Sequence, residues 1–237
     1  VDIKEAVEKI VTGRIFDNGI ICSGEQTVIA PEELYDEVMT EMKANGGYIV
    51  SDPAEKEKMV TALFPGGNIN RDLVGQTIQA IAKTAGIEMP ESTKVIVIPE
   101  DASNKTSLLR KEKMFPVIVP FKYGDFNEAV EIALENLDVE GKGHSVTIHS
   151  ENDEHILELG ERAPVGRVLV NQPCSLSIGG TFQNGLNATS TLGCGSWGNN
   201  SISENFYYKH LLNITRVAKI RKNAVIPTDE ELWAEED

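Results

Sequence analysis

Two short apolar runs, each beside a proline, constrain the fold of this chain more than any other feature. They are KVIVIP (residues 94–99) and PVIVPF (residues 116–121). Runs rich in Val and Ile, without polar alternation, are typical of strands buried on both faces of a parallel sheet. Helix-like segments of about ten residues separate these runs from weaker strand-like segments. This alternation predicts an α/β fold with parallel strand pairs.

The expected helices follow the spacing of apolar residues and the positions of capping residues. The first covers residues 2–12, with Asp2 as its N-cap, Glu5 completing a capping box and Gly13 suited to its end. Further helices are expected over residues 31–44, 56–63, 75–85, 125–137 and 153–162. Strands are expected over residues 27–30, 48–50, 94–99, 116–121, 145–149 and 167–170.

The net charge and the cysteine content indicate which kinds of partner the chain can bind and which cellular compartment it belongs to. The chain has 237 residues, a formal net charge of −15 and three widely spaced cysteines. Such an acidic excess argues against binding nucleic acid or an anionic membrane surface, because both need clustered Lys and Arg. No apolar run approaches the roughly 20 residues of a membrane helix. An odd number of cysteines argues against a disulfide framework, so we expect a protein of the reducing cytoplasm.

The amino-acid composition of the chain changes at Asn171. From there to about residue 205, Gly, Asn, Ser and Thr dominate. Irregular segments of that length are usually functional or disordered, and because this one carries Phe182 and Trp197 we expect it to be ordered and functional. A basic segment, helix-like or extended, comes next, and the chain ends in an acidic stretch, DEELWAEED. Since the first residue is Val1 and not Met, we expect a piece of a longer chain.

Cys22 lies in the segment whose composition points most directly to chemistry. In FDNGIICSGEQ (residues 16–26), Gly19 and Gly24 let backbone N–H groups approach the sulfur and any oxyanion formed beside it. The residues alone leave two interpretations open, a nucleophilic thiol and a buried inert cysteine.

Other candidate residues, when each is taken alone, also allow more than one role. His144 begins a predicted strand and fits either a general base or a surface histidine. Glu112 fits a solvated charge, and Cys174 and Cys194 fit either pocket-lining or incidental loop residues. Neither the cysteines nor the four histidines have the spacing of a zinc site.

The hexapeptide GCGSWG (residues 193–198) has the spacing of a dinucleotide-binding fingerprint. That fingerprint follows a strand, opens a helix and has an acidic residue about 20 positions further on. Here polar segments lie on both sides, and Glu204 comes too soon. A tight turn near a pocket, or a plain loop, fits the hexapeptide better.

Taken together, the motifs resemble those of one enzyme family. In chain order they are VDIKEAVEKIVTGRIFDNGIICSGEQ, KEKMFPVIVPF, GKGHSVTIHS, RVLVNQP and TLGCGSWGNNSISENFYYKHLLNITRVA. This series resembles the catalytic half of the CoA-acylating aldehyde dehydrogenases, from residue 2 to about residue 233. TGRIFDNGIICSGEQ, GCGSWGNNSISENFYYKHLLNI and IPTDEELW look closest to the CoA-dependent succinate-semialdehyde dehydrogenases. Acetaldehyde and sulfoacetaldehyde enzymes share much of the pattern.

The resemblance implies a fold, a division of the chain and a set of partners. It implies a three-layer catalytic domain with a largely parallel sheet over residues 1–215, and a tail over residues 216–237. The family's nucleotide-binding domain and oxyanion asparagine belong to a preceding segment that this chain lacks, so we expect the chain to be inactive alone. The complete protein is expected to be a homodimer or larger that uses NAD or NADP, coenzyme A and a small-molecule aldehyde.

The resemblance also implies roles for individual residues. Cys22 corresponds to the nucleophile that carries the thioacyl intermediate, with its own backbone N–H donating to the oxyanion. Glu112, in the sequence EKMFP, corresponds to the glutamate that binds the nicotinamide ribose. His144 corresponds to a histidine near the thioester that assists attack by CoA. The substrate pocket is expected to include Asn171, Cys174, Ile178 and Cys194.

Alternatives remain for the substrate and for the activity. No Arg or Lys lies between Arg167 and Lys209, so an anionic substrate tail would be bound by backbone groups, hydroxyls or residues elsewhere. A cofactor-independent cysteine acyl-transfer or thioesterase domain, and a binding module with an inert Cys22, are the competing hypotheses.

Overall fold

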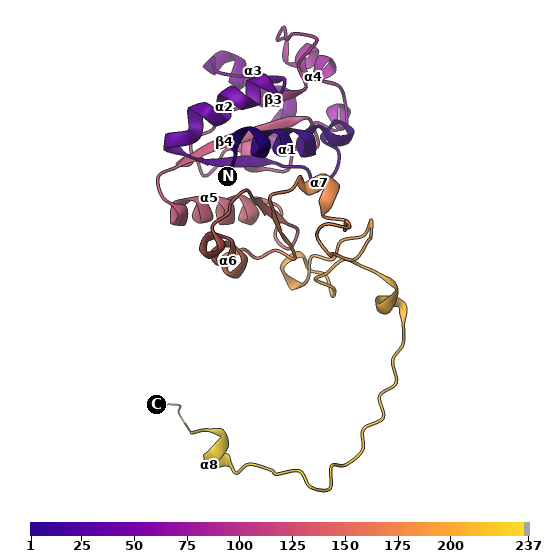
Figure 1. The fold of residues 1–237 in the computed structure, drawn as a ribbon. Coiled ribbons are helices and arrows are strands. Elements are labelled where there is room, and N and C mark those ends of the chain that lie inside the picture. The colour runs from indigo at the N-terminus through magenta and orange to yellow at the C-terminus, as the bar shows by residue number, and fades with distance from the viewer. Residues whose placement is uncertain (235–237) are drawn as a thin grey trace. The chain divides into compact units, whose positions relative to one another are not determined.

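A four-stranded parallel sheet with the strand order β1-β4-β3-β2 forms the centre of the fold (Figure 1). A second, two-stranded parallel sheet joins β5 and β6. This computed structural model describes residues 1–234, and the chain divides into two compact units, Val1–Tyr207 and a second that begins at Tyr208. The predicted α/β fold with parallel strand pairs is confirmed.

The regular elements of the first unit alternate along the chain as predicted. Its helices are α1 (Ile3–Ile15), α2 (Tyr35–Ala44), α3 (Pro53–Leu63), α4 (Ile78–Ala85), α5 (Phe126–Val139), α6 (Asp153–Arg162) and the single-turn α7 (Cys174–Ser177). Its strands are β1 (Thr27–Pro31), β2 (Gly47–Ile49), β3 (Val95–Val97), β4 (Val117–Tyr123), β5 (Val146–Ile148) and β6 (Val168–Val170).

Helices cover both faces of the central sheet, which explains the unbroken apolar runs. Val95 and Val97 of β3 pack with α1 and α2, through side chains that include Val11 and Met42. Ile96, between them, faces the opposite side, in a core built with α3, α4 and α5. Successive strand residues point to opposite faces, so a central strand covered on both sides must be apolar at every position.

Helix α1 begins after Asp2 as predicted, but the Glu5 side chain pairs with Lys9 instead of completing a capping box, and the helix does not end at Gly13. The side chain of Asp2 accepts a hydrogen bond from the backbone N–H of Glu5 at 3.0 Å, and the helix continues to Ile15. A Cβ atom on Gly13 would lie 2.1 Å from a carboxylate oxygen of Glu25. Glycine allows the Glu25 carboxylate to approach the helix here, and the prediction that it ends the helix was wrong.

Three other helices begin at residues different from those predicted, for local reasons. Pro31 ends β1 and a 3-10 turn, Glu32–Leu34, precedes α2. Helix α3 begins at Pro53, where the side chain of Asp52 caps two backbone N–H groups. Helix α4 begins only after Thr77, whose hydroxyl accepts from the N–H of Ala80.

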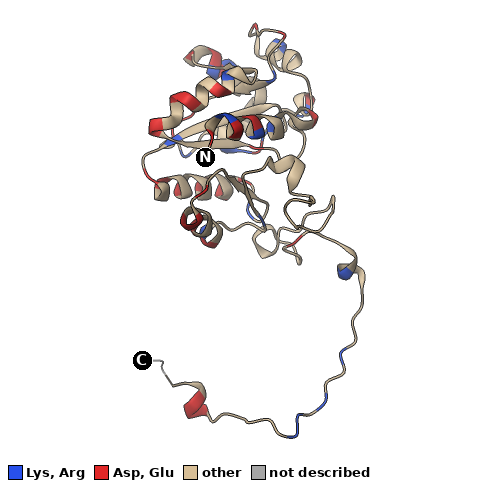
Figure 2. Cartoon of the chain, in the orientation of Figure 1, with Lys and Arg blue, Asp and Glu red and all other residues tan. Residues whose placement is uncertain are grey.

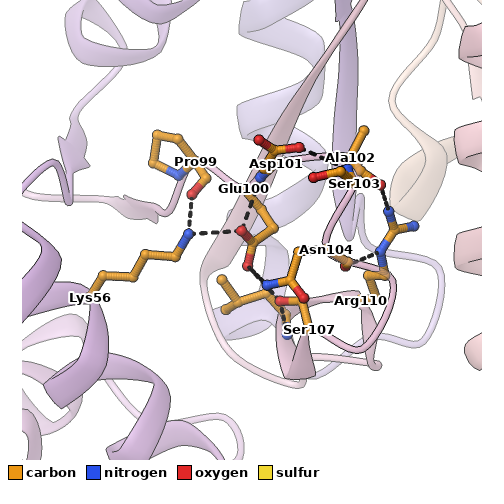
Figure 3. Close-up of polar contacts among 10 residues, drawn as sticks. Lys56, Pro99, Glu100, Asp101, Ala102, Ser103, Asn104, Ser107 and Arg110 are labelled. Atoms are coloured by element: carbon orange, nitrogen blue, oxygen red, sulfur yellow. Dashed lines mark hydrogen bonds and ion pairs between the residues drawn. The ribbon is translucent and has the colours of Figure 1, made fainter.

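The loop between β3 and β4 is fixed by largely part-buried polar contacts (Figure 3). The carboxylate of Glu100 accepts hydrogen bonds from Lys56 Nζ of α3 at 3.0 Å and from Ser107 Oγ at 2.5 Å. Arg110 donates to the carbonyl oxygens of Ala102 and Asn104 and, through Nη1, to Asn136 of α5 at 2.6 Å. The loop is therefore tied to helices on either side, and it leads directly into Glu112.

The second unit has two short regular segments within the described residues. They are a 3-10 turn, Tyr208–Leu211, and helix α8 (Asp229–Leu232), where Thr228 and Glu231 form a capping box. The basic residues between them lie on chain without helix or strand, which includes a turn closed by the hydrogen bond from the N–H of Ala224 to the carbonyl oxygen of Arg221 (Figure 2). The predicted division of the chain at residue 215 concerns domains and stays a prediction.

Arg14, in the last turn of α1, is fully buried and joins three parts of the first unit. Its guanidinium donates to the backbone carbonyl oxygens of Gly19, Gly24, Glu25, Lys113 and Phe115. Burial lowers the pKa of Arg14 to about 10, an effect that Glu25 and then Glu112 oppose, so the side chain is charged at neutral pH. One cation therefore holds α1, the Cys22 loop and the entry to β4 together.

We expect Arg14→Met to lower the free energy of unfolding by about 3 kcal/mol or more, because it leaves several buried carbonyl groups unsatisfied. Urea denaturation of the chain measures the loss. Arg162→Met is the control, since Arg162 pairs with Glu131 and Glu158 at the surface and should cost under about 1 kcal/mol. Equal losses for the two variants would contradict the central role of Arg14.

Candidate active site

Cys22 is held by a turn of unusual backbone conformation. Asp17, Asn18 and Gly19 all have left-handed φ angles, 49°, 51° and 73°. A Cβ atom on Gly19 would lie 2.3 Å from the carbonyl oxygen of Phe115, so only glycine fits that position. The turn reverses the chain after α1 and places the exposed Cys22 thiol before β1.

His144 faces this thiol from the second sheet. Its Nε2 atom lies 3.2 Å from Sγ of Cys22, although 122 residues separate the two in sequence. His144 lies just before β5, and Arg167, just before β6, donates from Nη2 to the carbonyl oxygen of His144 at 2.9 Å. The structure therefore brings together the two residues for which the sequence predicted catalytic roles.

Both members of this pair are neutral at neutral pH. The side chain of Cys22 is exposed only in part; its partial desolvation, and then the negative charge of Glu112, raise the pKa of the thiol, while the N–H groups of Cys22 and Ser23 act in the opposite direction. Burial and then the charge of Arg167 lower the pKa of His144. A neutral thiol beside a neutral imidazole can transfer its proton at the moment of attack, so no resting thiolate is needed.

Glu112 lies on the same cavity as this pair. The cavity has a volume of about 680 Å³, and Cys22, Glu112, His144, Cys174 and Cys194 all line it. Burial and then Glu140 raise the pKa of the Glu112 carboxyl, against the charges of Arg14 and Lys113. Among the described residues, none donates a hydrogen bond to this carboxylate, which leaves it open to a hydroxyl-bearing ligand such as a ribose.

Asn171 and Ile178 lie elsewhere. The side-chain amide of Asn171 pairs with both backbone polar groups of Ser150, at 3.0 and 2.8 Å, and so extends the pairing of β5 with β6. Ile178 is 3% exposed in an apolar cluster with Leu169 and Cys174. Neither lines the cavity around Cys22, so their assignment to the substrate pocket stays a prediction.

The irregular segment after residue 171 contains two local structures. Helix α7 interrupts this segment near its start, and its first residue, Cys174, is buried beside Ser145. The GCGSWG hexapeptide forms a turn at Gly195 (φ 61°) and a 3-10 helix of three residues, Ser196–Gly198. That geometry is a tight turn at the cavity wall, with Cys194 on the wall.

Glu25, Ser145 and Arg167 belong to the site but were missed in the sequence. Glu25 follows Cys22 by three positions, and its Oε1 accepts from the backbone N–H of Cys174 at 2.7 Å. Burial raises the pKa of the Glu25 carboxyl to about 7. The sequence offered one signal for this contact, a glycine at position 13 inside a strongly helical segment.

A family match covers the whole of the first unit. Residues 1–211 match the model of the aldehyde dehydrogenase family. The chain belongs to the aldehyde dehydrogenase family. The resemblance inferred from the motifs is thereby confirmed at the level of the family.

Relatives of this aldehyde dehydrogenase chain carry the names of acylating enzymes. It is 50% identical over 232 residues to a succinate-semialdehyde dehydrogenase (acetylating) of Clostridium kluyveri, covering 98% of this chain and 51% of the relative. It is 36% identical over 242 residues to a sulfoacetaldehyde dehydrogenase (acylating) of Bilophila wadsworthia, covering 99% and 51%. The chain thus spans about half the length of the curated relatives it matches.

Solved structures give the same picture. An acetylating aldehyde dehydrogenase from Geobacillus thermoglucosidasius superposes with a TM-score of 0.85 at 34% identity, covering 95% of this chain and 50% of that one.

Within residues 1–234, no helix is long and apolar enough to cross a membrane. The same residues contain no group of three or more His, Cys, Asp or Glu side chains that could hold a metal ion.

The raised pKa of Cys22 gives a prediction for its reactivity. Alkylation of Cys22 by iodoacetamide, followed by peptide mass spectrometry, should have its pH midpoint above that of a free cysteine. Glu112→Gln should lower the midpoint, because it removes a negative charge that disfavours the thiolate. Glu57→Gln, the same change on the exposed surface of α3, should leave it unchanged. A midpoint that rises in Glu112→Gln would contradict the assignment.

The raised pKa of Glu25 gives a prediction for stability. Between the unfolded value of 4.5 and the folded value of about 7, the folded chain holds a proton that the unfolded chain releases. The free energy of unfolding should therefore fall across this range, by up to a few kcal/mol. His149, with its pKa lowered to about 4 mainly by burial, contributes the opposite slope from about 4 to 6.5.

The quantity to measure is therefore the difference between the wild type and Glu25→Gln in urea denaturation at successive pH values. The difference should shift by up to a few kcal/mol in favour of Glu25→Gln between pH 4.5 and 7. Glu57→Gln should show no such trend. A difference independent of pH would contradict the buried, protonated state of Glu25.

Proposed function

We propose that the complete protein catalyses the NAD- or NADP-dependent, CoA-acylating oxidation of an aldehyde, in a reversible reaction with a thioacyl intermediate on Cys22. The observation that carries the proposal is the 3.2 Å contact between Cys22 Sγ and His144 Nε2 on the wall of the cavity. The acylating names of the relatives support the same reaction class. Balanced, the reaction converts aldehyde, CoA thiol and oxidised cofactor into acyl-CoA, reduced cofactor and a proton.

In the first half-reaction, the Cys22 sulfur attacks the aldehyde carbon while its proton passes to His144 Nε2. The backbone N–H of Cys22 donates to the developing oxyanion of the thiohemiacetal. When bound, NAD or NADP supplies the acceptor for the hydride that leaves this carbon. Glu112 binds the ribose hydroxyls of that cofactor.

Before the second half-reaction, His144 releases to solvent the proton that it took from Cys22, which is the proton of the net reaction. His144 then takes the proton of the CoA thiol as that sulfur attacks the thioester carbon. Cys22 leaves as a thiolate, and His144 returns this proton to it. One neutral imidazole thus serves both halves, first for the thiol of Cys22 and then for the thiol of CoA. The lowered pKa of His144 keeps it in the basic form for each step.

We propose succinate semialdehyde as the substrate, which gives succinyl-CoA. The support is the 50% identity to the Clostridium kluyveri enzyme, against 36% to the sulfoacetaldehyde enzyme. We further propose a cytoplasmic protein that is a homodimer or larger in its complete form. In that protein residues 1–215 form the catalytic domain, and this chain alone does not complete the reaction.

The test is formation of NAD(P)H by the complete protein with CoA and each of succinate semialdehyde, sulfoacetaldehyde and acetaldehyde. Succinate semialdehyde should give the highest kcat/KM. Cys22→Ala should reduce it by about 10³-fold or more, and His144→Asn by about 10²-fold or more. Full activity of Cys22→Ala would overturn the mechanism. Turnover of acyl-CoA without any nicotinamide cofactor would favour a cysteine acyl-transferase.

A further inference from the structure

A series of hydrogen bonds connects the pair formed by Cys22 and His144 to the interior of the protein. Cys22 Sγ lies 3.2 Å from His144 Nε2, and the other ring nitrogen, Nδ1, lies 2.8 Å from Ser145 Oγ. Ser145 Oγ in turn lies 3.4 Å from Cys174 Sγ. The imidazole is therefore contacted on both nitrogens, and the second contact leads to a buried thiol.

The far end of this series is anchored to the loop that carries the nucleophile. The backbone N–H of Cys174 donates to Glu25 Oε1 at 2.7 Å, and Glu25 lies three residues after Cys22. Ser175, the next residue of α7, donates to the carbonyl oxygen of Gly13 on α1 at 2.6 Å. Cys174 thus cannot move away from Ser145 without breaking contacts to both α1 and the Cys22 loop.

The protonation state of Cys174 determines which hydrogen bonds Ser145 can make. Cys174 is 5% exposed, and burial, followed by the charge of Glu25, raises its pKa to about 12. It is therefore a neutral thiol whose sulfur can accept a weak hydrogen bond. A serine hydroxyl has one proton to donate and lone pairs to accept, so Ser145 can accept from His144 while it donates to Cys174.

Only one tautomer of His144 leaves a lone pair facing the proton of Cys22. If Nδ1 carries the ring proton, Nε2 is free to accept the thiol proton; if Nε2 carries it, the base is blocked. The partner of Nδ1 decides between these tautomers, because it must accept in the first case and donate in the second.

We propose that Ser145 is a positioning residue whose hydroxyl accepts the Nδ1 proton of His144 and donates its own proton to Cys174 Sγ, so that Nε2 faces Cys22 unprotonated. On attack, the S–H bond of Cys22 breaks and an N–H bond forms at Nε2, while Nδ1 and Ser145 keep their protons. The resulting imidazolium retains its contact with the Ser145 oxygen. The inference rests on the proposed role of His144 as the base.

The first measurement is the tautomer of His144 in the ¹⁵N-labelled chain, by long-range proton–nitrogen correlation, with His144→Gln to assign its signals among the four histidines. We expect the proton on Nδ1 in the wild type. Ser145→Ala should shift it towards Nε2, and Ser145→Thr, which keeps the hydroxyl, should preserve it on Nδ1. A wild-type His144 protonated on Nε2 would overturn the proposal, whatever the variants do.

The second measurement is the rate of Cys22 alkylation by iodoacetamide at pH 7.5. Ser145→Ala should slow alkylation by about 10-fold, which is less than the 10²-fold or more expected when the general base itself is lost. Ser145→Thr should restore the rate to within about 2-fold of the wild type. Ser51→Ala removes an exposed hydroxyl just before α3, outside the series, and should leave rate and tautomer unchanged. Circular dichroism verifies that each variant is folded.

An unchanged tautomer and rate in folded Ser145→Ala would overturn the proposal. Neither measurement involves an aldehyde, CoA or a nicotinamide cofactor. A failure of the proposed oxidation, seen as full activity of Cys22→Ala in the complete protein, is therefore distinguishable from a failure of this positioning role.

Discussion

The buried guanidinium of Arg14 is the interaction on which the first unit depends. It satisfies backbone carbonyl groups of the Cys22 loop and of the segment that enters β4, at the point where α1 ends. Neither of those segments is regular, so their carbonyls have no partners in a helix or strand ladder. A planar fork with five donors meets this requirement, which a single ammonium group could not.

Around this cation the protein accumulates ionisable groups whose pKa values are displaced towards neutrality. Burial raises the pKa of Glu25 to about 7, and burial together with the charge of Arg14 lowers that of Lys113 to about 7. Because Cys22 is partly desolvated and lies near the Glu112 carboxylate, the protonated form of its thiol is favoured at rest. A reaction that begins with Cys22 must then include a proton acceptor, and His144 is placed to be one.

The sequence was informative wherever a local rule also controls the structure. Asp125 caps α5 through the N–H of Glu128, and Gly86 ends α4 in a left-handed conformation, both as their residue types indicate. The apolar strand runs were equally clear. Gly13 was misinterpreted because its role is set by Glu25, which approaches it from another segment, and no local pattern records such an approach.

The sequence by itself determined the order of strands and helices and the family, and it singled out Cys22 as the expected nucleophile, because periodicity, capping and motif order are properties of neighbouring residues. The tertiary structure decided which groups meet. It placed His144 against Cys22, Ser145 between His144 and Cys174, and Glu25 beneath α7. It also decided protonation, since the pKa of a thiol, imidazole or carboxyl depends on burial and on charges that only the folded chain brings near.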